Sequence, residues 1–353
     1  MPIFAPSKHQ KMKPKHSHPS YEDAQEQYAA LGIDTEQVLE EMQDFHLSLP
    51  CWPTNDVEAM RFELLEAIHK LPGKHRVSLD LSCLEQVEDW IKWGREHRIK
   101  LDFDAIDTPT QQTSTLTLAH PNNQTRTYWI DALRRCREKA NAIGAAQQSP
   151  CVVNIHINDA STEPTVERSL YRDLLGESLD QLFDRKYRWM RDSLMPRCSD
   201  TRRDARGSGT EDFCFGYAVA NRKMLTLDTG HCAADATKMA DKVSAMLCHV
   251  PGVVLVLADN SMPEVFDEVV RSGSMRRVHF VLDGAARSGH RAETLVARGG
   301  AAQQCMLRAL LEPTSLLHGY EINGMRDEEL VLMERCKTLP WSRIFEEFCQ
   351  RES

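Results

Sequence analysis

The sequence lacks the features that would place it among secreted, membrane or nucleic-acid-binding proteins. Its first 20 residues contain no apolar core of a signal peptide, and no run of about 18 apolar residues occurs in the chain. The formal net charge of −9 does not suit a surface that binds nucleic acid phosphates. We therefore expect a cytoplasmic protein that acts on a neutral small molecule, with no nucleic acid and no membrane as partner.

Paired cysteine motifs and glycine-rich nucleotide motifs are also missing. The 11 cysteines are scattered from Cys51 to Cys349 without a Cys-x-x-Cys pair, which is typical of buried, reduced thiols. No motif places a cysteine beside a histidine, apart from the sequence neighbours His231 and Cys232, so cysteine nucleophile chemistry has no support. No glycine fingerprint follows the first expected strand, which argues against a nucleotide-binding Rossmann fold.

The chain is long enough, and apolar enough, for one barrel-sized domain. Its 353 residues are 41% hydrophobic and can bury a large core. Residues 1–19 are rich in lysine and histidine, and we expect a disordered basic tail there; the alternative is a segment that binds a metal ion or an acidic surface. Residues 20–351 are then expected to form a single domain.

Hydrophobic periodicity predicts strands that alternate with helices. Two capped helices begin at Ser20 and Asp34, and three helical patterns follow residue 290. The arginine-rich stretch 191–209 breaks the pattern, and we expect a mobile loop there. The alternation favours an α/β fold, a (β/α)8 TIM barrel with N-terminal helices and a C-terminal helical extension, over an open doubly wound sheet. The expected strands are 45–49, 76–81, 99–103, 116–119, 151–157, 213–218, 224–227, 252–258 and 277–282.

Several of these strands end in side chains that can bind a metal ion. The run at 224–227 is followed by Asp228 and, after a turn, by His231. A carboxylate and an imidazole at the end of a barrel strand are typical metal ligands, whereas the alternative is an aspartate that caps the next helix and a surface histidine. The third strand likewise ends in carboxylates, at Asp102 and Asp104.

The order of the motifs along the chain resembles that of the bacterial L-rhamnose isomerase family. The similarity extends from about Tyr21 to Arg351, and its specificity lies in the order of the motifs rather than in any one of them. The matching segments include CWPTNDV at 51–57, LDF at 101–103, VVNIHIND at 152–159, FGYA at 215–218, LDTGH at 227–231 and RVHFVLD at 277–283.

The resemblance implies a fold, a reaction and a cofactor. The family is a (β/α)8 barrel, usually a homotetramer, that interconverts L-rhamnose and L-rhamnulose with Mn²⁺ or a similar divalent cation. Moving hydrogen between C1 and C2 of a sugar builds negative charge on the substrate oxygens, which such a cation stabilises. We therefore expect a small-molecule sugar as ligand and a homo-oligomer, by resemblance a tetramer.

Carried over position by position, the family's metal site is only partly present. Its LDxGH motif falls on Asp228 and His231, and the aspartate that ends its VHxxLD strand falls on Asp283. Its bridging glutamate falls on Met195, and a ligand histidine falls on Val256. A thioether cannot replace a carboxylate around a hard cation.

The family's pocket segments are altered as well. A lysine after the bridging glutamate becomes Arg197, and the pocket tryptophan of the fourth strand becomes His156. The family's Trp-Asp-Ser-Asp-His loop is absent between Ala258 and Pro263, and an insertion after its Cys-Trp motif is missing. His156 is either a ligand at the barrel mouth or a packed side chain, and Arg197 either holds a sugar oxygen or has no role.

Two hypotheses follow from this pattern. In the first, the chain is an aldose–ketose isomerase with a reduced metal site made by Asp228, His231 and Asp283. In the second, it is a non-catalytic relative that keeps the barrel for sugar binding, regulation or subunit assembly, because helix and core motifs persist where pocket motifs do not. The absent ligands favour weakened or lost catalysis.

Overall fold

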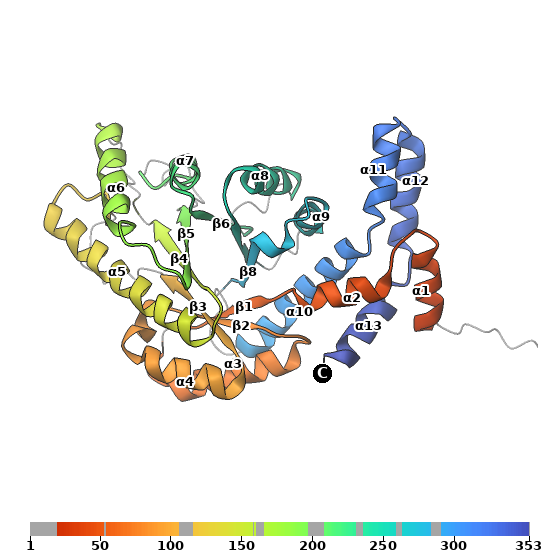
Figure 1. The fold of residues 1–353 in the computed structure, drawn as a ribbon, viewed down its shortest axis with the longest axis horizontal. Helices are drawn as coiled ribbons and strands as arrows, with labels where there is room; N and C mark the ends of the chain where they lie inside the picture. The colour runs from red at the N-terminus through yellow and green to blue at the C-terminus, as the bar shows by residue number, and fades with distance from the viewer. Residues whose placement is uncertain are drawn as a thin grey trace, which may run out of the picture.

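The computed structural model describes residues 20–52, 54–105, 116–157, 159, 166–196, 208–230, 236–258, 263–283 and 291–352. Within them, parallel strands form a closed barrel in sequence order, and the last strand pairs with the first. The predicted (β/α)8 fold is therefore confirmed (Figure 1). The strands are β1 Leu47–Pro50, β2 Arg76–Leu79, β3 Lys100–Ala105, β4 Cys151–Ile157, β5 Met190–Pro196, β6 Met224–Asp228, β7 Val253–Leu257 and β8 Val278–Leu282.

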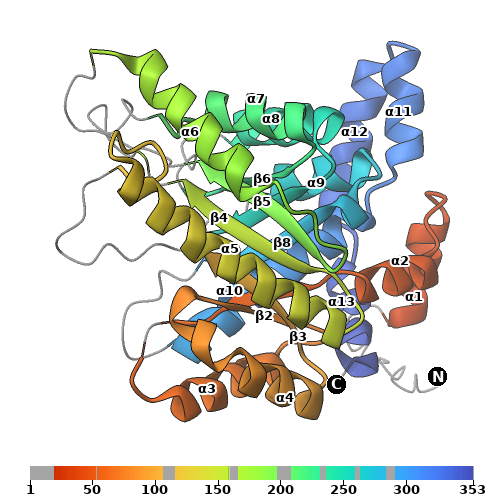
Figure 2. The ribbon, with the colours of Figure 1, turned by 60° about the vertical axis from the view of Figure 1, so that its left-hand side comes forward.

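A helix follows every strand and packs outside the barrel, as Figure 2 shows for α4, α5 and α6. A 3-10 turn, Leu81–Gln86, precedes α4. Over the described part of the chain, no helix has the length and apolar composition needed to cross a membrane. The surrounding helices are α3 Val57–Lys70, α4 Val87–His97, α5 Asn123–Ala146, α6 Arg168–Leu182, α7 Glu211–Asn221, α8 Ala236–His249, α9 Pro263–Arg271 and α10 Arg291–Leu310.

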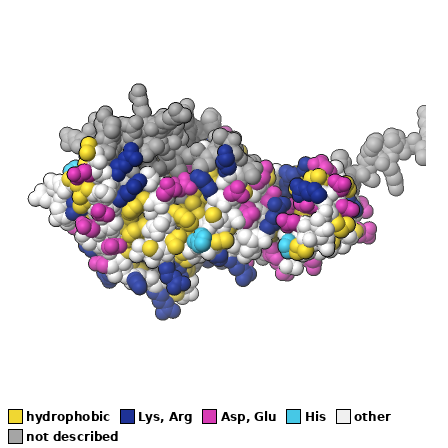
Figure 3. Space-filling model, turned by 90° about the horizontal axis from the view of Figure 1, so that it is seen from above, with side chains coloured by type: hydrophobic (Ala, Val, Ile, Leu, Met, Phe, Trp, Pro, Cys, Tyr) yellow, Lys and Arg dark blue, Asp and Glu magenta, His cyan; other side chains and the backbone are white. Residues whose placement is uncertain are grey.

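The remaining helices form a lobe at one side of the barrel (Figures 1 and 3). Both ends of the described chain meet in this lobe, where α1 contacts α13 (Figure 1). Arg351 joins the two ends, since its guanidinium lies 2.6 Å from Glu36 Oε2 and its side chain stacks near the Tyr21 ring. The predicted capping box is present, because the Ser20 hydroxyl accepts from Asp23 and the Asp23 carboxylate accepts from Ser20. The helices of the lobe are α1 Tyr21–Ala29, α2 Thr35–Gln43, α11 Thr314–Ile322, α12 Arg326–Lys337 and α13 Trp341–Arg351.

Four local predictions were wrong. Residues 191–196 of the stretch predicted as a mobile loop belong to β5, whose polar Arg191, Asp192 and Ser193 hid the strand pattern, and residues 197–207 of that stretch lie outside the described residues. Residues 213–218 belong to helix α7, where Thr210 caps the first turn. Residues 116–119 form bends and turns rather than a strand, and α11 was not expected.

Apolar and polar residues alternate along most of the strands because the inside of the barrel is partly polar. On β1, Leu47 and Leu49 are fully buried toward the helices, whereas Ser48 faces the interior and contacts Asp102. Parallel strands covered on both faces usually form continuous apolar runs. Only β7, VVLVL, has that pattern among the described strands, because its inward residues Val254 and Val256 belong to an apolar cluster inside the barrel.

Candidate functional site

The candidate site lies at the carboxyl ends of the strands, where barrel enzymes place their chemistry. Its wall on β3 and β4 is polar. His156 Nε2 lies 2.7 Å from Asp104 Oδ1, and the Asn154 amide donates to the same oxygen at 2.9 Å. Both side chains of the histidine–aspartate pair remain partly accessible, at 17% and 15% exposure. An imidazole beside a carboxylate can transfer protons to and from a bound molecule.

This polar wall continues through β5 and β6 below the mouth. Thr226 Oγ1 donates to Asn154 Oδ1 at 2.6 Å, and Ser193 Oγ lies 2.7 Å from Thr226 Oγ1. Thr226 and Ser193 are fully buried, so these hydrogen bonds fix the orientation of the Asn154 amide. The Asn154 amide in turn lies 3.3 Å from His156 Nε2 and helps to place the imidazole.

The wall on β7 and the end of β8 is apolar. Val254 and Val256 of β7 pack against Val281 of β8, and Met195 of β5 and Met224 of β6, which lie on the strands of the polar wall, pack against this cluster. Asp228 at the end of β6 is in register with Val256, and Val256 is in register with Val281. The strand between Asp228 and Asp283 therefore presents a valine to the interior.

The structure places three of the five predicted site residues as follows. Asp228 is nearly buried, at 8% exposure, and its Oδ1 accepts from the Gly230 amide at 2.8 Å. Asp283 follows β8, and Arg298 donates to its carbonyl at 2.7 Å and lies 3.8 Å from its carboxylate. His156 pairs with Asp104. Asp104 had been noticed as a strand-ending carboxylate without a role, and only the barrel brings it to His156.

The other two predicted residues, His231 and Arg197, lie outside the described residues. Among the residues that are described, no group of three His, Cys, Asp or Glu side chains lies together as a metal site requires. Mn²⁺ prefers octahedral oxygen and imidazole ligands, and the described wall beside Asp228 offers valine and methionine instead. The described residues alone do not fit this cation.

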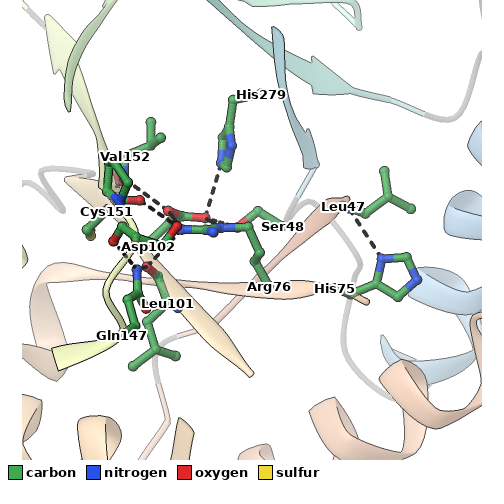
Figure 4. A network of polar contacts seen from close by, with 12 residues as sticks. Leu47, Ser48, His75, Arg76, Leu101, Asp102, Gln147, Cys151, Val152 and His279 are labelled. Atoms are coloured by element: carbon green, nitrogen blue, oxygen red, sulfur yellow. Dashed lines mark hydrogen bonds and ion pairs between the residues drawn. The ribbon is translucent and has the colours of Figure 1, made fainter. Parts of the chain in front are cut away.

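Below the site, a buried ionic network forms the floor of the barrel (Figure 4). Asp102 receives two hydrogen bonds of 2.6 Å from Arg76, and His279 Nε2 lies 3.1 Å from its Oδ2. The Ser48 hydroxyl and the Val152 amide also donate to this carboxylate. Burial raises the pKa of Asp102, but the positive charge of Arg76 and the contact with His279 outweigh it, so the pKa lies well below its usual range.

A second buried carboxylate holds a loop beside the mouth. Asp159, which follows β4, is fully buried and accepts from the amides of Thr117, Leu118 and Ala119 at 2.6, 3.3 and 2.8 Å. The Thr117 hydroxyl adds a fourth hydrogen bond at 2.9 Å. Burial is the largest influence on this group and raises the pKa of Asp159. The loop that enters α5 is thereby tied to the end of β4.

The closed barrel defines the chain as a (β/α)8 barrel protein, and solved structures with this fold are similar to it. D-allulose 3-epimerase from Methylomonas sp. matches with a TM-score of 0.51 and 13% identity over 74% of this chain and 98% of that chain. 3-Keto-D-glucoside 4-epimerase from E. coli matches with a TM-score of 0.50 and 11% identity over 74% and 98%. At these identities the likeness shows the fold alone.

The sequence comparisons identify the family. The family model for L-rhamnose isomerase (RhaA) matches residues 16–66 and 58–353. The L-rhamnose isomerase of Bacteroides thetaiotaomicron is 36% identical over 388 residues, covering 95% of this chain and 93% of that protein. That of Rhodopirellula baltica is 29% identical, covering 94% and 90%. The chain belongs to the L-rhamnose isomerase family.

The comparison also bears on the length of the chain. The alignment to the Bacteroides protein spans 388 positions, more than the 353 residues of this chain. The Bacteroides protein therefore contains segments that have no counterpart here, as expected for a shortened member.

Proposed function

We propose that this protein binds an aldose of the L-rhamnose type in the barrel mouth, and that metal-dependent isomerisation to the ketose is strongly weakened or lost. Family membership supports the sugar as ligand. Mn²⁺ or a similar divalent cation is the cofactor that the resemblance implies, and Asp228, His231 and Asp283 are the residues that would hold it.

The observation that carries this proposal is the apolar wall beside Asp228. Val256 is the register neighbour of Asp228, and Met195 packs on the same cluster. By resemblance these two positions hold a histidine and a glutamate in the family. Neither an isopropyl group nor a thioether stabilises a hard divalent cation, so the charge that develops on a sugar oxygen would be poorly stabilised.

Sugar binding is supported by the polar wall. The partly exposed His156 and Asp104 lie at the mouth, and the Asn154 amide beneath them is held by Thr226. A few fixed polar groups on one side and an apolar surface on the other are typical of a small-molecule site. Hydroxyl groups of a sugar would form hydrogen bonds with the histidine and the carboxylate, and the face of the sugar that presents its C–H bonds would pack on the valines.

The direct test combines metal analysis, calorimetry and a ketose assay. With Mn²⁺ present, we expect L-rhamnose to bind. We expect turnover to be at least about a hundredfold lower than that of the Bacteroides relative assayed in parallel, because loss of only the hydrogen-bond partners of metal-ligating side chains already costs about 10- to 100-fold. His156→Ala should weaken binding, whereas the exposed His97→Ala should not. Stoichiometric metal with comparable turnover that Asp228→Asn abolishes would refute weakened catalysis. Absence of L-rhamnose binding would refute the assigned ligand.

Two double variants test whether the apolar wall is what weakens metal binding. Met195→Glu with Val256→His restores the two ligand types, and we expect Mn²⁺ affinity to increase by at least about tenfold. Met195→Gln with Val256→His is the matched control, because glutamine has the size of glutamate without its charge. Equal metal affinity in the two variants would show that the apolar wall is not what limits metal binding.

A further inference from the structure

At the amino-terminal end of the barrel, opposite the candidate site, a cavity of about 630 Å³ lies among the loops that enter β5, β6, β7 and β8. Barrel enzymes place their chemistry at the other end, so this cavity is separate from the mouth. Its lining is strongly basic, although the whole chain carries a net charge of −9. The basic lining residues are Arg137, Lys186, Arg191, Arg222, Lys223, Arg276 and Arg277.

The acidic side chain in this lining, Asp192, is already shared by two of the cations. Arg137 Nε lies 2.8 Å from Asp192 Oδ1, and Lys223 Nζ lies 2.8 Å from Asp192 Oδ2. Asp192 is nearly buried, and Arg137 is fully buried beneath the cavity. One carboxylate therefore compensates two positive charges, and the inner wall keeps an excess of positive charge.

Three further cations of the lining are exposed and form no ion pair with another described residue: Lys186, Arg191 and Arg222. Arg191 donates only to backbone carbonyls, including that of Met190 at 2.9 Å. Arg277 is committed to the carbonyls at the end of α8, among them Val250 at 2.6 Å. The groups free to meet a ligand are thus one lysine and two arginines on the rim, whereas Lys223 on the wall is already paired with Asp192.

A second cavity of about 380 Å³ adjoins the first and shares Arg276, Val278 and His279 with it. Arg276 lies 3.2 Å from Asp44, so that rim is charge-compensated. The excess of positive charge is therefore concentrated on the side formed by Lys186, Arg191 and Arg222.

We propose that the larger cavity binds the phosphate group of a small phosphorylated metabolite. Arginine presents a planar fork of donors that matches phosphate oxygens, and charge-assisted hydrogen bonds to phosphate are among the strongest in proteins. Gathering this many like charges is unfavourable unless an anion compensates them. The cavity lies at the other end of the barrel from the proposed sugar site and does not depend on it.

Arg222 offers a test with a closely matched control. It ends α7 in the left-handed conformation, with φ of 52°, and Arg98 ends α4 in the same conformation, with φ of 58°. Both arginines are exposed, and Arg98 lines a different cavity. Glycine adopts this backbone conformation freely, so Arg222→Gly and Arg98→Gly each remove one positive charge without backbone strain.

Inorganic phosphate and glucose 6-phosphate are titrated calorimetrically into the full chain at constant ionic strength, with glucose as the neutral control. We expect glucose 6-phosphate to bind at this cavity and glucose not to bind there. Arg222→Gly should bind both phosphates about tenfold more weakly than the wild type, whereas Arg98→Gly should bind them with unchanged affinity. Arg191→Gln should weaken binding similarly, and circular dichroism verifies that each variant is folded. Both phosphates should raise the melting temperature of the wild type more than that of Arg222→Gly.

No binding of either phosphate, or equal weakening by both glycine variants, would overturn the proposal. An acidic surface of a second copy of the chain is the competing occupant. If Arg222→Gly lowers self-association in sedimentation velocity while neither phosphate binds, the cavity serves that contact and the proposal is wrong.

Discussion

At the scale of single residues, Asp102 and Arg76 are an ion pair that no solvent screens. The exposed fractions of their side chains are 2% and 8%. Their mutual attraction offsets the cost of removing both charges from water, and each side chain depends on the other. Ser48, Val152 and His279 add contacts from three further strands, so the pair joins the strands at the barrel floor (Figure 4).

Removing one member of this pair should destabilise the protein more than removing both. Arg76→Leu leaves the Asp102 carboxylate buried without its partner, and we expect a loss of about 3–5 kcal/mol in the free energy of unfolding. The double variant Arg76→Leu/Asp102→Leu should recover part of that loss. Urea denaturation measures both values, and a double variant less stable than the single variant would contradict the argument.

His75 makes stability depend on pH in a defined direction. Burial lowers the pKa of this histidine from 6.5 to about 4, while its Nδ1 accepts from the Leu47 amide at 3.3 Å. The unfolded chain therefore binds the proton more tightly than the folded chain. The contribution of neutral His75 to the free energy of unfolding is full above pH 6.5 and is lost as the pH falls toward 4. Between pH 7 and 5 the loss is about 2 kcal/mol.

His75→Gln should remove that part of the pH dependence, since glutamine can accept from Leu47 and does not titrate. The difference in unfolding free energy between pH 7 and 5 should be about 2 kcal/mol smaller in the variant than in the wild type. The exposed His97→Gln controls for the loss of a histidine elsewhere. If all three proteins show the same difference, His75 is not the group that titrates.

At the scale of elements, Asp159 connects β4 to the loop before α5. Its carboxylate accepts three amide hydrogen bonds and one hydroxyl hydrogen bond, and Ser178 of α6 holds the same loop by donating to the Leu118 carbonyl at 2.7 Å. Asp159→Ala leaves buried amides without acceptors, which costs about 2–4 kcal/mol. In hydrogen exchange, the Leu118 and Ala119 amides should exchange much faster in the variant than in the wild type. The exchange rates of the β7 amides should be unchanged when the two proteins are compared at equal global stability. Unchanged exchange at Leu118 would show that another group holds this loop.

The α11–α12 hairpin projects from the lobe (Figures 1 and 2). It carries exposed apolar side chains. Ile322 and Val331 are each 70% exposed, and Leu330 is 45% exposed. Such a group of apolar side chains is typical of a protein contact. We propose that a second copy of the chain covers it, in keeping with the homo-oligomer that the family resemblance implies.

Ile322→Glu and Val331→Glu should therefore reduce the mass of the assembly in light scattering after size exclusion. Phe62→Glu on α3 is the matched control, because Phe62 is 69% exposed on a different surface. A monomeric wild type, or the same reduction in the control, would exclude the hairpin as the contact.

At the scale of the whole molecule, the barrel divides its interior into a polar half and an apolar half. Asn154 and Thr226 belong to the polar half, which reaches the mouth at His156. Val254, Val256 and Val281 form the apolar half. This division explains both the alternating strands and the single continuous apolar strand β7, and it limits which side of the mouth can offer ligands to a cation.

The sequence predicted the elements whose patterns are local. The strand at Cys151–Ile157 was predicted with its observed bounds, because it has a clear pattern and clear ends. β5 was missed, since Asp192 is buried only through its contacts with Arg137 and Lys223. α7 was taken for a strand because Phe213, Phe215 and Tyr217 alternate, although its N-cap Thr210 is a local signal of a helix.

The sequence by itself determined the fold class, the family and the positions of Asp228 and Asp283 at strand ends, because these depend on periodicity and on motif order along the chain. Only the tertiary structure decided that His156 pairs with Asp104, and that basic residues from four separate segments surround one cavity. Those contacts join residues far apart in the chain, and they exist only after the barrel has closed and fixed the register of its strands.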